Sequence, residues 1–274
     1  MLSRRGLLAG SALALLAGCS SSPPSPAPGP PPVPAPTRPS APREPVTVQR
    51  MRSAARGTDV DLVLITPEGV PASGLPVCLA LHGRGAQART FLSLGVPALL
   101  TAAVRAGNPP FAFAAIDGDH YWVNVGGGDD PQRMLTDEVP GWLAARDLRP
   151  PSGVFGISMG GFGALRFARA HPDLKAVATA SAALFVSWPD ARSRKVFADE
   201  MNWRAEEPLL HTADLRPAGL GVWCGESDPF RGADRRLVKA VSPETSRFSA
   251  GGHDDEYWRG VLPEIVKFVG ERLS

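Results

Sequence analysis

Residues 153–163 read GVFGISMGGFG and place Ser158 at the centre of a G-x-S-x-G motif. A short apolar run, 153–157, precedes the serine, and a segment rich in alanine and arginine, 164–170, follows it. A strand before the serine and a helix after it are the setting in which this motif forms a tight, strained turn that lifts the hydroxyl clear of a sheet. The stretch therefore predicts a nucleophilic serine at the carboxyl end of a buried strand.

Strand-like and helix-like segments alternate along residues 46–274. We expect an antiparallel pair first, at 46–51 and 59–66. The other expected strands are 76–81, 111–116, 154–157, 176–180, 220–224 and 246–249. The expected helices are 97–105, 131–146, 160–169, 233–241 and 256–272. Such alternation builds βαβ units. The sequence therefore predicts a single α/β domain, with a mainly parallel sheet covered by helices on both faces.

A nucleophilic serine needs a base, and the base needs an acid to orient it. Three histidines follow Ser158, at positions 171, 211 and 253. His253 lies in a loop of small residues between the last expected strand and the last expected helix, so it is the predicted base. His171 ends the helix after the serine and is expected to cap it, whereas His211 lies in an irregular segment.

The acid is expected directly after the apolar strand 220–224. Asp228 is the predicted acid there, and Glu226 is the alternative in the same loop. Asp254 and Asp255 adjoin His253 in sequence and are poorly placed to reach its far ring nitrogen. The predicted triad is thus Ser158, Asp228 and His253, in an order that is known for such triads.

A tetrahedral intermediate also needs hydrogen-bond donors for its oxyanion. The backbone N–H of Met159, the residue after the nucleophile, is the first predicted donor. The second is expected from the loop after the strand 76–81, which reads Leu-His-Gly-Arg-Gly at positions 81–85, with Arg84 N–H as the donor. We expect a structural role for His82 in this loop.

With these residues assembled, the chain resembles the esterase D family of α/β-hydrolases from about Val77 to the C-terminus. Relatives include S-formylglutathione hydrolases, feruloyl esterases, enterochelin esterases and mycolyltransferases. The motifs that carry the resemblance are Leu-His-Gly at 81–83, Gly-Ile-Ser-Met-Gly-Gly at 156–161, Gly-Glu-Ser-Asp at 225–228, Gly-His at 252–253 and Tyr-Trp at 257–258.

The resemblance implies an α/β-hydrolase fold and a serine carboxylesterase that works through an acyl-enzyme. Mycolyltransferases carry a glutamate as triad acid, whereas this chain offers Asp228. Members often have a tryptophan two residues after the histidine, where this chain has Asp255. Both departures favour hydrolysis. The alternatives are an acyltransferase with the same triad and a non-catalytic envelope lipoprotein on a hydrolase scaffold.

Two segments are candidates for contact with substrate. The stretch 117–122 resembles one that borders the cleft in the family, so Tyr121 and Trp122 are expected to bind substrate. Residues 183–217 carry the second set, which forms either an apolar cover for the acyl group or the packing of small helices: Leu184, Phe185, Trp188, Phe197 and Trp203.

The N-terminus predicts export and anchoring. Residues 1–18 contain paired arginines and an apolar run too short to span a membrane. They end before Cys19 in a sequence that resembles a bacterial lipobox, which implies cleavage there and lipidation of the Cys19 thiol. The arginines also resemble a twin-arginine signal. Residues 19–45 form the predicted lipidated tether, because 12 of residues 23–45 are proline. The expected location is outside the cytoplasm, on the bacterial cell membrane.

Charge and composition bear on partners and cofactors. Without Arg4 and Arg5 the chain has 27 basic and 27 acidic residues, which gives no reason to expect nucleic acid. The expected partners are a small-molecule or lipid ester and the membrane that holds the N-terminal lipid; no obligate protein partner is evident. No cluster has metal-ligand spacing, and no cofactor is indicated. Cys78 and Cys224 lie in strand-like runs and are expected as free, buried thiols.

Overall fold

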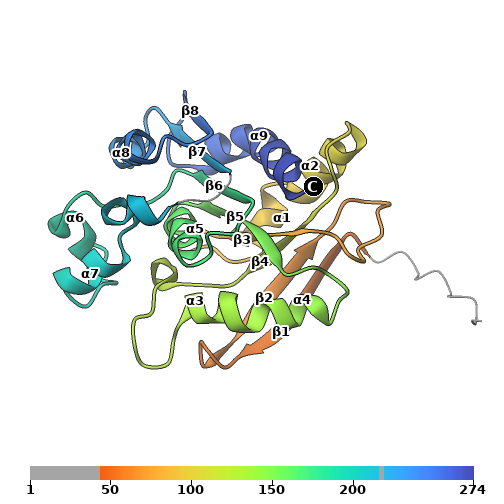
Figure 1. The fold of residues 1–274 in the computed structure, drawn as a ribbon, viewed down its shortest axis with the longest axis horizontal. Coiled ribbons are helices and arrows are strands. Elements are labelled where there is room, and N and C mark those ends of the chain that lie inside the picture. The colour runs from red at the N-terminus through yellow and green to blue at the C-terminus, as the bar shows by residue number, and fades with distance from the viewer. Residues whose placement is uncertain (1–43, 216–218) are drawn as a thin grey trace, which may run out of the picture. The chain divides into compact units, whose positions relative to one another are not determined.

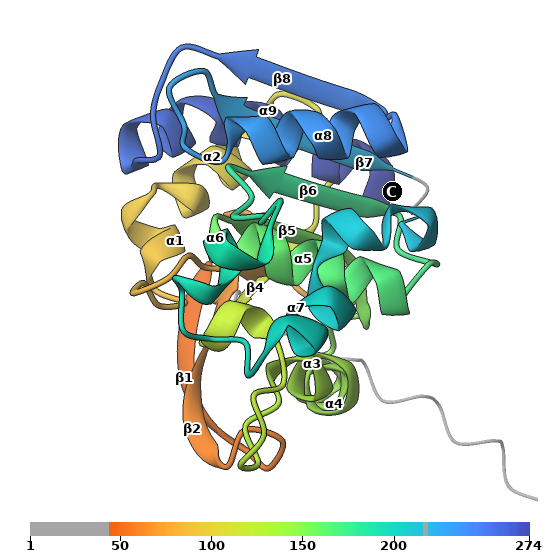
Figure 2. The same cartoon turned by 90° about the vertical axis from the view of Figure 1, so that its left-hand side faces the viewer.

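The computed structural model describes residues 44–215 and 219–274, shown from two directions in Figures 1 and 2. These residues all belong to one compact unit, Ala41–Ser274. The predicted leader, the predicted lipidation of Cys19 and nearly all of the predicted tether lie outside the described residues. Within the described part of the chain, no helix has both the length and the apolar character needed to cross a membrane.

Eight strands form one sheet in the order β1-β2-β4-β3-β5-β6-β7-β8. Their bounds are Val46–Ser53 (β1), Thr58–Ile65 (β2), Val77–Leu81 (β3), Ala112–Ile116 (β4), Pro151–Ile157 (β5), Ala176–Ala180 (β6), Leu220–Gly225 (β7) and Thr245–Ser249 (β8). The pairs β1–β2 and β2–β4 are antiparallel, and the other neighbouring pairs are parallel. The expected mainly parallel sheet and the antiparallel pair at its start are confirmed. Because β3 to β8 run in parallel, their carboxyl ends meet at one edge of the sheet.

Helices cover both faces of this sheet (Figures 1 and 2). The longer ones are α2 (Val96–Arg105), α5 (Met159–Ala170), α8 (Arg231–Val241) and α9 (Asp255–Leu273), and the shorter ones are α1 (Thr90–Ser93), α3 (Pro131–Arg133), α4 (Val139–Ala144), α6 (Trp188–Arg192) and α7 (Glu200–Glu206). Side chains alternate across each strand, so Leu79 and Cys78 enter separate cores. The core with Leu79 includes α4, α5 and α8, and the core with Cys78 includes α2 and α9. The predicted coverage of both faces is confirmed.

The helix expected over 131–146 is not continuous. It begins as predicted, with the Asp130 side chain accepting a hydrogen bond from Arg133 N–H, and then passes through a π-turn, η2 (Met134–Glu138), before α4 starts. Pro140 explains the break, because proline has no N–H to donate and its ring clashes with the carbonyl four residues earlier. A π-turn is a common way to absorb such a local mismatch.

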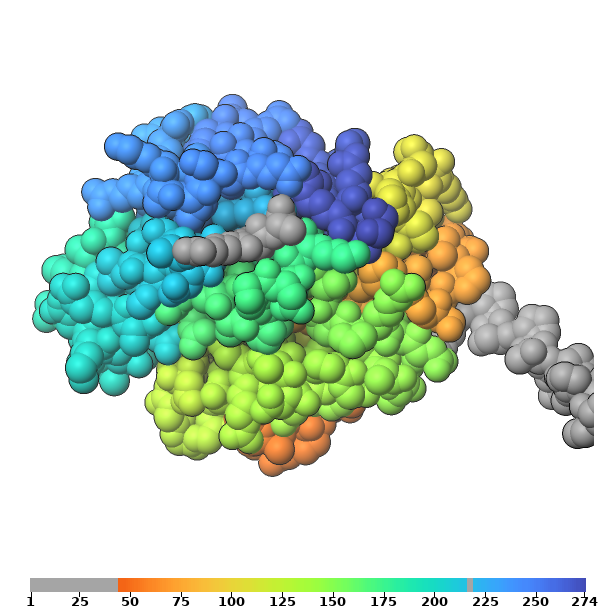
Figure 3. Space-filling model, viewed as in Figure 1, coloured from red at the N-terminus to blue at the C-terminus, as the bar shows by residue number. Residues whose placement is uncertain are grey.

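The segment between β6 and β7 holds short helices, which agrees with the second of the two alternatives for residues 183–217. These are α6, α7 and two 3₁₀ turns, η3 (Pro208–Leu210) and η4 (Thr212–Asp214). In the space-filling view this cyan segment lies directly against the green atoms of α5 (Figure 3). The contact includes an ion pair of 2.5 Å between Arg166 Nε and Glu206 Oε2. The segment is therefore a packed part of the domain.

Both cysteines of the described residues are free and buried, as expected. Cys78 lies on β3 and Cys224 on β7, and β5 and β6 separate these strands in the sheet. Burial raises the pKa of both thiols, so they remain protonated. They therefore contribute packing volume in two parts of the core.

Candidate active site

Ser158 lies at the turn between β5 and α5 in a conformation that few residues adopt. Its φ is 55° and its ψ is −118°, outside the usual regions for a residue with a side chain. The turn is fixed on both sides, because Ser158 N–H donates to Ala180 O at 2.9 Å and Ser158 O accepts from Gly161 N–H at 2.9 Å. The predicted strand–turn–helix geometry around this serine is present.

Glycines allow the tight turn because backbone atoms approach closely there. A Cβ atom on Gly156 would overlap the carbonyl of Gly160, and one on Gly160 would overlap the carbonyl of Leu81. The turn thus packs against β5 on one side and against the end of β3 on the other. A larger residue at either position would push the serine away from its place.

Three side chains from separate loops meet at the carboxyl edge of the sheet. His253 Nε2 lies 2.8 Å from Ser158 Oγ, and His253 Nδ1 lies 2.8 Å from Asp228 Oδ2. Asp228 follows β7 and His253 follows β8, so parallel strands bring residues 158, 228 and 253 together. Asp228 Oδ1 accepts a hydrogen bond from Phe230 N–H at 2.8 Å, and its side chain has no exposed area. This carboxylate is therefore held in one orientation toward the histidine.

The alternative acid and the neighbouring acids have other partners. Glu226 forms ion pairs with Arg231 at 3.2 Å and Arg235 at 2.7 Å, and its side chain is 41% exposed. Asp254 caps α9 by accepting from Tyr257 N–H at 2.9 Å. The geometry thus separates Asp228 from these rival carboxylates.

The other downstream histidines lie away from Ser158 as well. His171 is the C-cap residue of α5, and its Nδ1 bonds Phe167 O at 2.8 Å, as expected for a cap. His211 bonds Arg204 O through Nε2 at 2.7 Å. Neither histidine is positioned to act on the nucleophile.

The loop after β3, residues 82–85, is named the oxyanion loop after its predicted role, and it lies against the nucleophile. A Cβ atom on Gly83 would lie 3.3 Å from Ser158 Cβ, which shows how near this loop passes. Neither Arg84 N–H nor Met159 N–H has a protein acceptor among the described residues. Met159 is the first residue of α5, where N–H groups have no partner in the helix and the helix dipole favours negative charge. Both N–H groups are thus available to an oxyanion, and their role as its donors stays a prediction.

His82 holds this loop in place. Its Nε2 accepts a hydrogen bond from Gly118 N–H at 3.0 Å, so Nδ1 carries the proton and donates to Gly83 O at 2.8 Å. Burial lowers the pKa of His82, which keeps the ring neutral. The expected structural role agrees with these contacts, which tie the loop after β3 to the loop after β4.

The two residues expected to bind substrate have different environments. Tyr121 lines the cavity at Ser158. Trp122 does not, because it is fully buried between the oxyanion loop and α5, with its indole N–H 3.3 Å from His82 O. A Cβ atom on Gly163 of α5 would overlap this indole, so the glycine makes room for it. The prediction for Trp122 is therefore corrected: it supports the oxyanion loop from beneath.

The cavity at Ser158 has a volume of about 350 Å³. Its lining residues come from the loops after β3, β7 and β8, from α1, β5 and the start of α9, from the 3₁₀ turn η1 (His120–Trp122) and from the segment after α6. They include Arg84, Phe91, Leu94, Tyr121, Ile157, Arg194, Phe230, His253, Asp255 and Trp258. His253 is packed between two rings of this lining, with Phe230 at 5.2 Å and Trp258 at 5.3 Å between ring centroids. Trp258 is fixed in turn by its indole N–H, which donates to Ser181 Oγ at 3.1 Å.

The model of a protein family described as "Putative esterase" matches residues 53–269 of the chain. The chain belongs to this family. It is therefore a serine ester hydrolase with the α/β-hydrolase fold, and the resemblance seen in the sequence is confirmed. A comparison with curated proteins gave no match.

Solved structures of esterases share the fold of this family member. A ferulic acid esterase is 20% identical, with a TM-score of 0.67 over 84% of this chain and 98% of that chain. An S-formylglutathione hydrolase from Agrobacterium tumefaciens is 17% identical, with a TM-score of 0.68 over 83% and 95%. Another, from Staphylococcus aureus, is also 17% identical, with a TM-score of 0.64 over 82% and 98%.

The aromatic residues between β6 and β7 pack in this esterase and do not line the Ser158 cavity. Phe185 and Phe197 form a cluster with Tyr121 and Phe162, with centroid distances from 5.3 to 6.4 Å. The same segment instead contributes Arg194 to the cavity. No sequence signal marked this arginine, because it lies in a polar stretch that reads as solvent-exposed.

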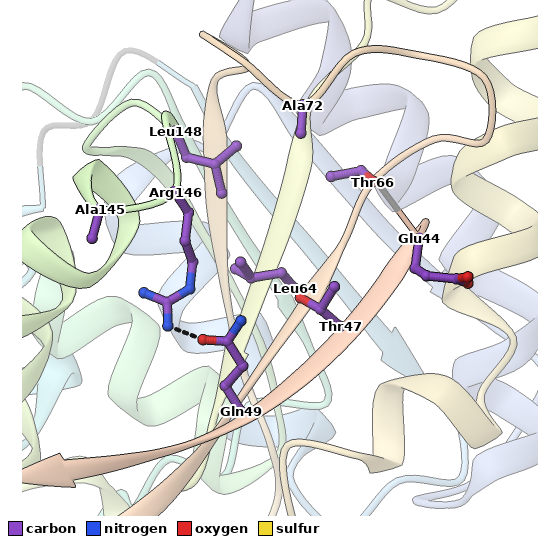
Figure 4. A pocket seen from close by; sticks show the side chains of 9 residues that line it. All are labelled: Glu44, Thr47, Gln49, Leu64, Thr66, Ala72, Ala145, Arg146 and Leu148. Atoms are coloured by element: carbon purple, nitrogen blue, oxygen red, sulfur yellow. Dashed lines mark hydrogen bonds between the residues drawn. The ribbon is translucent and has the colours of Figure 1, made fainter. Parts of the chain in front are cut away.

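A second hollow of about 520 Å³ lies against β1 and β2, at one end of the sheet (Figure 4). Its lining residues come from β1, β2 and the loops after β2 and α4, and none of them lines the Ser158 cavity. Inside it the Arg146 guanidinium bonds the Gln49 side-chain oxygen (Figure 4). The hollow contains no serine, cysteine or histidine, so the chemistry belongs to the smaller cavity.

The residues that the structure describes also contain no group of three or more histidine, cysteine, aspartate or glutamate side chains arranged to hold a metal ion.

Proposed function

We propose that this esterase is an exported, lipid-anchored carboxylesterase that uses Ser158 as nucleophile, His253 as base and Asp228 as acid. The observation that carries the proposal is the chain of two 2.8 Å contacts from Asp228 through His253 to Ser158, which ends at the floor of a cavity. A hydrogen-bonded serine and histidine, with a third group orienting the histidine, is the signature of an activated nucleophile.

In the proposed reaction, Ser158 Oγ attacks the carbonyl carbon of an ester while His253 Nε2 takes its proton. The oxyanion that forms accepts hydrogen bonds from the backbone N–H groups of Met159 and Arg84. His253 then gives its proton to the leaving alcohol, and the acyl group stays on Ser158. Water, deprotonated by His253, releases the acid and restores the serine. Asp228 keeps Nδ1 protonated and stabilises the charged imidazolium in both halves of the cycle.

Labelling with a fluorophosphonate probe tests the activated serine. We expect the wild-type protein to react, and Ser158→Ala and His253→Ala to be unreactive while remaining folded by circular dichroism. The same variants should lose turnover of 4-nitrophenyl acetate. Turnover by Ser158→Ala at the wild-type rate would contradict the proposed nucleophile. Absence of labelling in a folded wild-type protein would favour the non-catalytic scaffold.

The anchoring part of the proposal rests on the sequence of residues 1–45. In cells grown with an alkyne fatty acid, the wild-type protein should take up label and sediment with membranes, and Cys19→Ser should do neither. Replacing Arg4 and Arg5 with lysine tests the export route, because a twin-arginine signal needs the arginine pair itself. Unchanged export of the double lysine variant would indicate the general secretion route.

A further inference from the structure

The charged groups that line the Ser158 cavity are unequal in number. Two arginines, Arg84 and Arg194, have no carboxylate within ion-pair distance among the described residues. The one acidic residue of the lining, Asp255, is already paired with Arg259 at 3.1 Å. Of the two lining histidines, burial keeps His82 neutral. The cavity therefore presents uncompensated positive charge beside the nucleophile.

Arg194 is held in a defined place. Its guanidinium lies 5.4 Å from the ring centroid of Phe230 and 5.6 Å from that of Phe185, within the range of cation–π attraction. Its Nε atom is buried without a hydrogen-bond partner in the described residues. A buried donor without a partner is costly, and an anion in the cavity would reduce this cost. Phe230 also packs against His253, so the same ring contacts both Arg194 and the proposed base.

Arg84 lines the same cavity and comes from the loop after β3, far from Arg194 in sequence. Burial raises the pKa of Tyr121, and the charges of Arg194 and Arg84 act against this by favouring the phenolate. Both guanidinium groups thus act on one phenol, on the side of the cavity that Tyr121 lines. Phe91, Leu94 and Trp258 give the same lining an apolar part.

We propose that the Ser158 cavity selects esters that carry a carboxylate, which binds between the guanidinium groups of Arg84 and Arg194. The uncharged part of the substrate then lies on the apolar side. A wholly apolar acyl chain fits this cavity less well, because it would remove water from two charged groups and give them no partner in return. Guanidinium groups bind carboxylates through charge-assisted hydrogen bonds, often two at once. This proposal depends on the esterase function proposed above.

Two pairs of esters test the proposal and show which side of the ester bears the charge. For the alcohol side, 4-acetoxybenzoate is compared with its methyl ester. For the acyl side, mono-4-nitrophenyl adipate is compared with methyl 4-nitrophenyl adipate. Each kcat/KM is divided by the rate of the same ester with imidazole in buffer, which removes differences in intrinsic reactivity. The charged ester should be favoured about 10-fold or more in one pair, as expected for a charge-assisted hydrogen bond.

Variants assign the preference to the two arginines. Arg194→Gln and Arg84→Gln should each lower the charged-to-neutral ratio about 10-fold, and Arg84→Gln keeps the backbone N–H that faces the oxyanion. Arg192→Gln is the matched control, because Arg192 lies two residues from Arg194 and does not line the cavity. It should leave the ratio unchanged. High salt should lower the wild-type ratio, since exposed charges are screened.

The outcomes separate this proposal from the one on which it depends. If the neutral ester is hydrolysed as well as the charged one in both pairs, the proposed selection of carboxylates is overturned. The esterase function is not affected by that result. An equal fall of the ratio in Arg192→Gln would overturn the assignment to the cavity. No turnover of any ester, with no fluorophosphonate labelling of the folded protein, would overturn both proposals. If Arg194→Gln fails to fold, the exposed Arg84 carries the test.

Discussion

Asp228 Oδ2 lies 2.8 Å from His253 Nδ1, and the carboxylate that makes this contact has no solvent-exposed area. The second oxygen of the carboxylate accepts from Phe230 N–H, so both oxygens have fixed partners. A buried carboxylate in this position sets which ring nitrogen carries the proton. The consequence is a histidine whose Nε2 faces Ser158 as an acceptor.

The first prediction concerns Asp228→Asn. An asparagine amide keeps the shape but favours the wrong imidazole tautomer, so we expect kcat to fall by ~10⁴-fold, as in other triads. Steady-state kinetics with 4-nitrophenyl acetate measures this loss. The matched control is Glu226→Gln, which removes the alternative carboxylate and two surface ion pairs. Its kcat should stay near the wild-type value. The reverse ranking of these variants would assign the acid to Glu226.

The second prediction concerns His82→Gln. Because His82 holds the oxyanion loop through two backbone contacts, its loss should move a donor and lower kcat by up to ~10²-fold, the usual cost of a small misplacement. Reaction with the fluorophosphonate probe should persist, since His253 still activates Ser158. A variant that retains turnover but reacts more slowly fits this role. Complete loss of labelling in a folded His82→Gln protein would instead indicate that His82 acts as the base for Ser158.

The third prediction concerns Gly160→Ala. The new methyl group would overlap the Leu81 carbonyl, which belongs to a buried strand that cannot move freely. We expect a loss of about 1–3 kcal/mol in the free energy of unfolding, typical of overpacking. Urea denaturation measures it. Gly232→Ala, at a helical glycine with open space around it, is the control and should be neutral or slightly stabilising. Equal free energies of unfolding for the two variants would contradict the close approach of Gly160 to the Leu81 carbonyl.

The sequence predicted most of the sheet and named Ser158, Asp228 and His253, which the structure brings together, because both follow local rules. Apolar strands end in loops at one edge, and the G-x-S-x-G motif needs glycines wherever backbones touch. Trp122 shows where such rules stop. Its burial depends on the missing side chain of Gly163, which lies on another element. The interrupted helix around Pro140 is different, since the proline itself was a visible signal of a break.

Arg194 could not have been found from its neighbours in sequence. It reaches the Ser158 cavity only because the segment between β6 and β7 folds onto α5 and places its guanidinium near Phe230. This placement depends on contacts between elements far apart in the chain. The burial of Glu207, which organises the same segment, could not be predicted either, since a lone glutamate in a sequence is expected at the surface.

The last prediction concerns this buried Glu207. Its carboxylate accepts from Phe185 N–H and Trp203 Nε1, both at 3.1 Å, and from Leu209 N–H at 3.2 Å. Burial nevertheless raises its pKa from 4.5 to about 7. The folded state therefore holds the proton more tightly than the unfolded state, and the stability from this group is complete below pH 4.5 and lost as pH rises through 7.

Glu207→Gln removes this titration. Between pH 4.5 and 8, the free energy of unfolding of the wild type should fall relative to that of the variant by about 3 kcal/mol, since each pKa unit corresponds to ~1.4 kcal/mol. Urea denaturation at pH 4.5 and pH 8 measures the difference. Glu200→Gln is the control, because Glu200 lies in α7 of the same segment and forms only an exposed pair with Arg204. If the free energies of unfolding of the wild type and Glu207→Gln differ by the same amount at both pH values, the Glu207 carboxylate is ionised in the folded wild type throughout this range. Its three N–H donors would then outweigh the cost of burial.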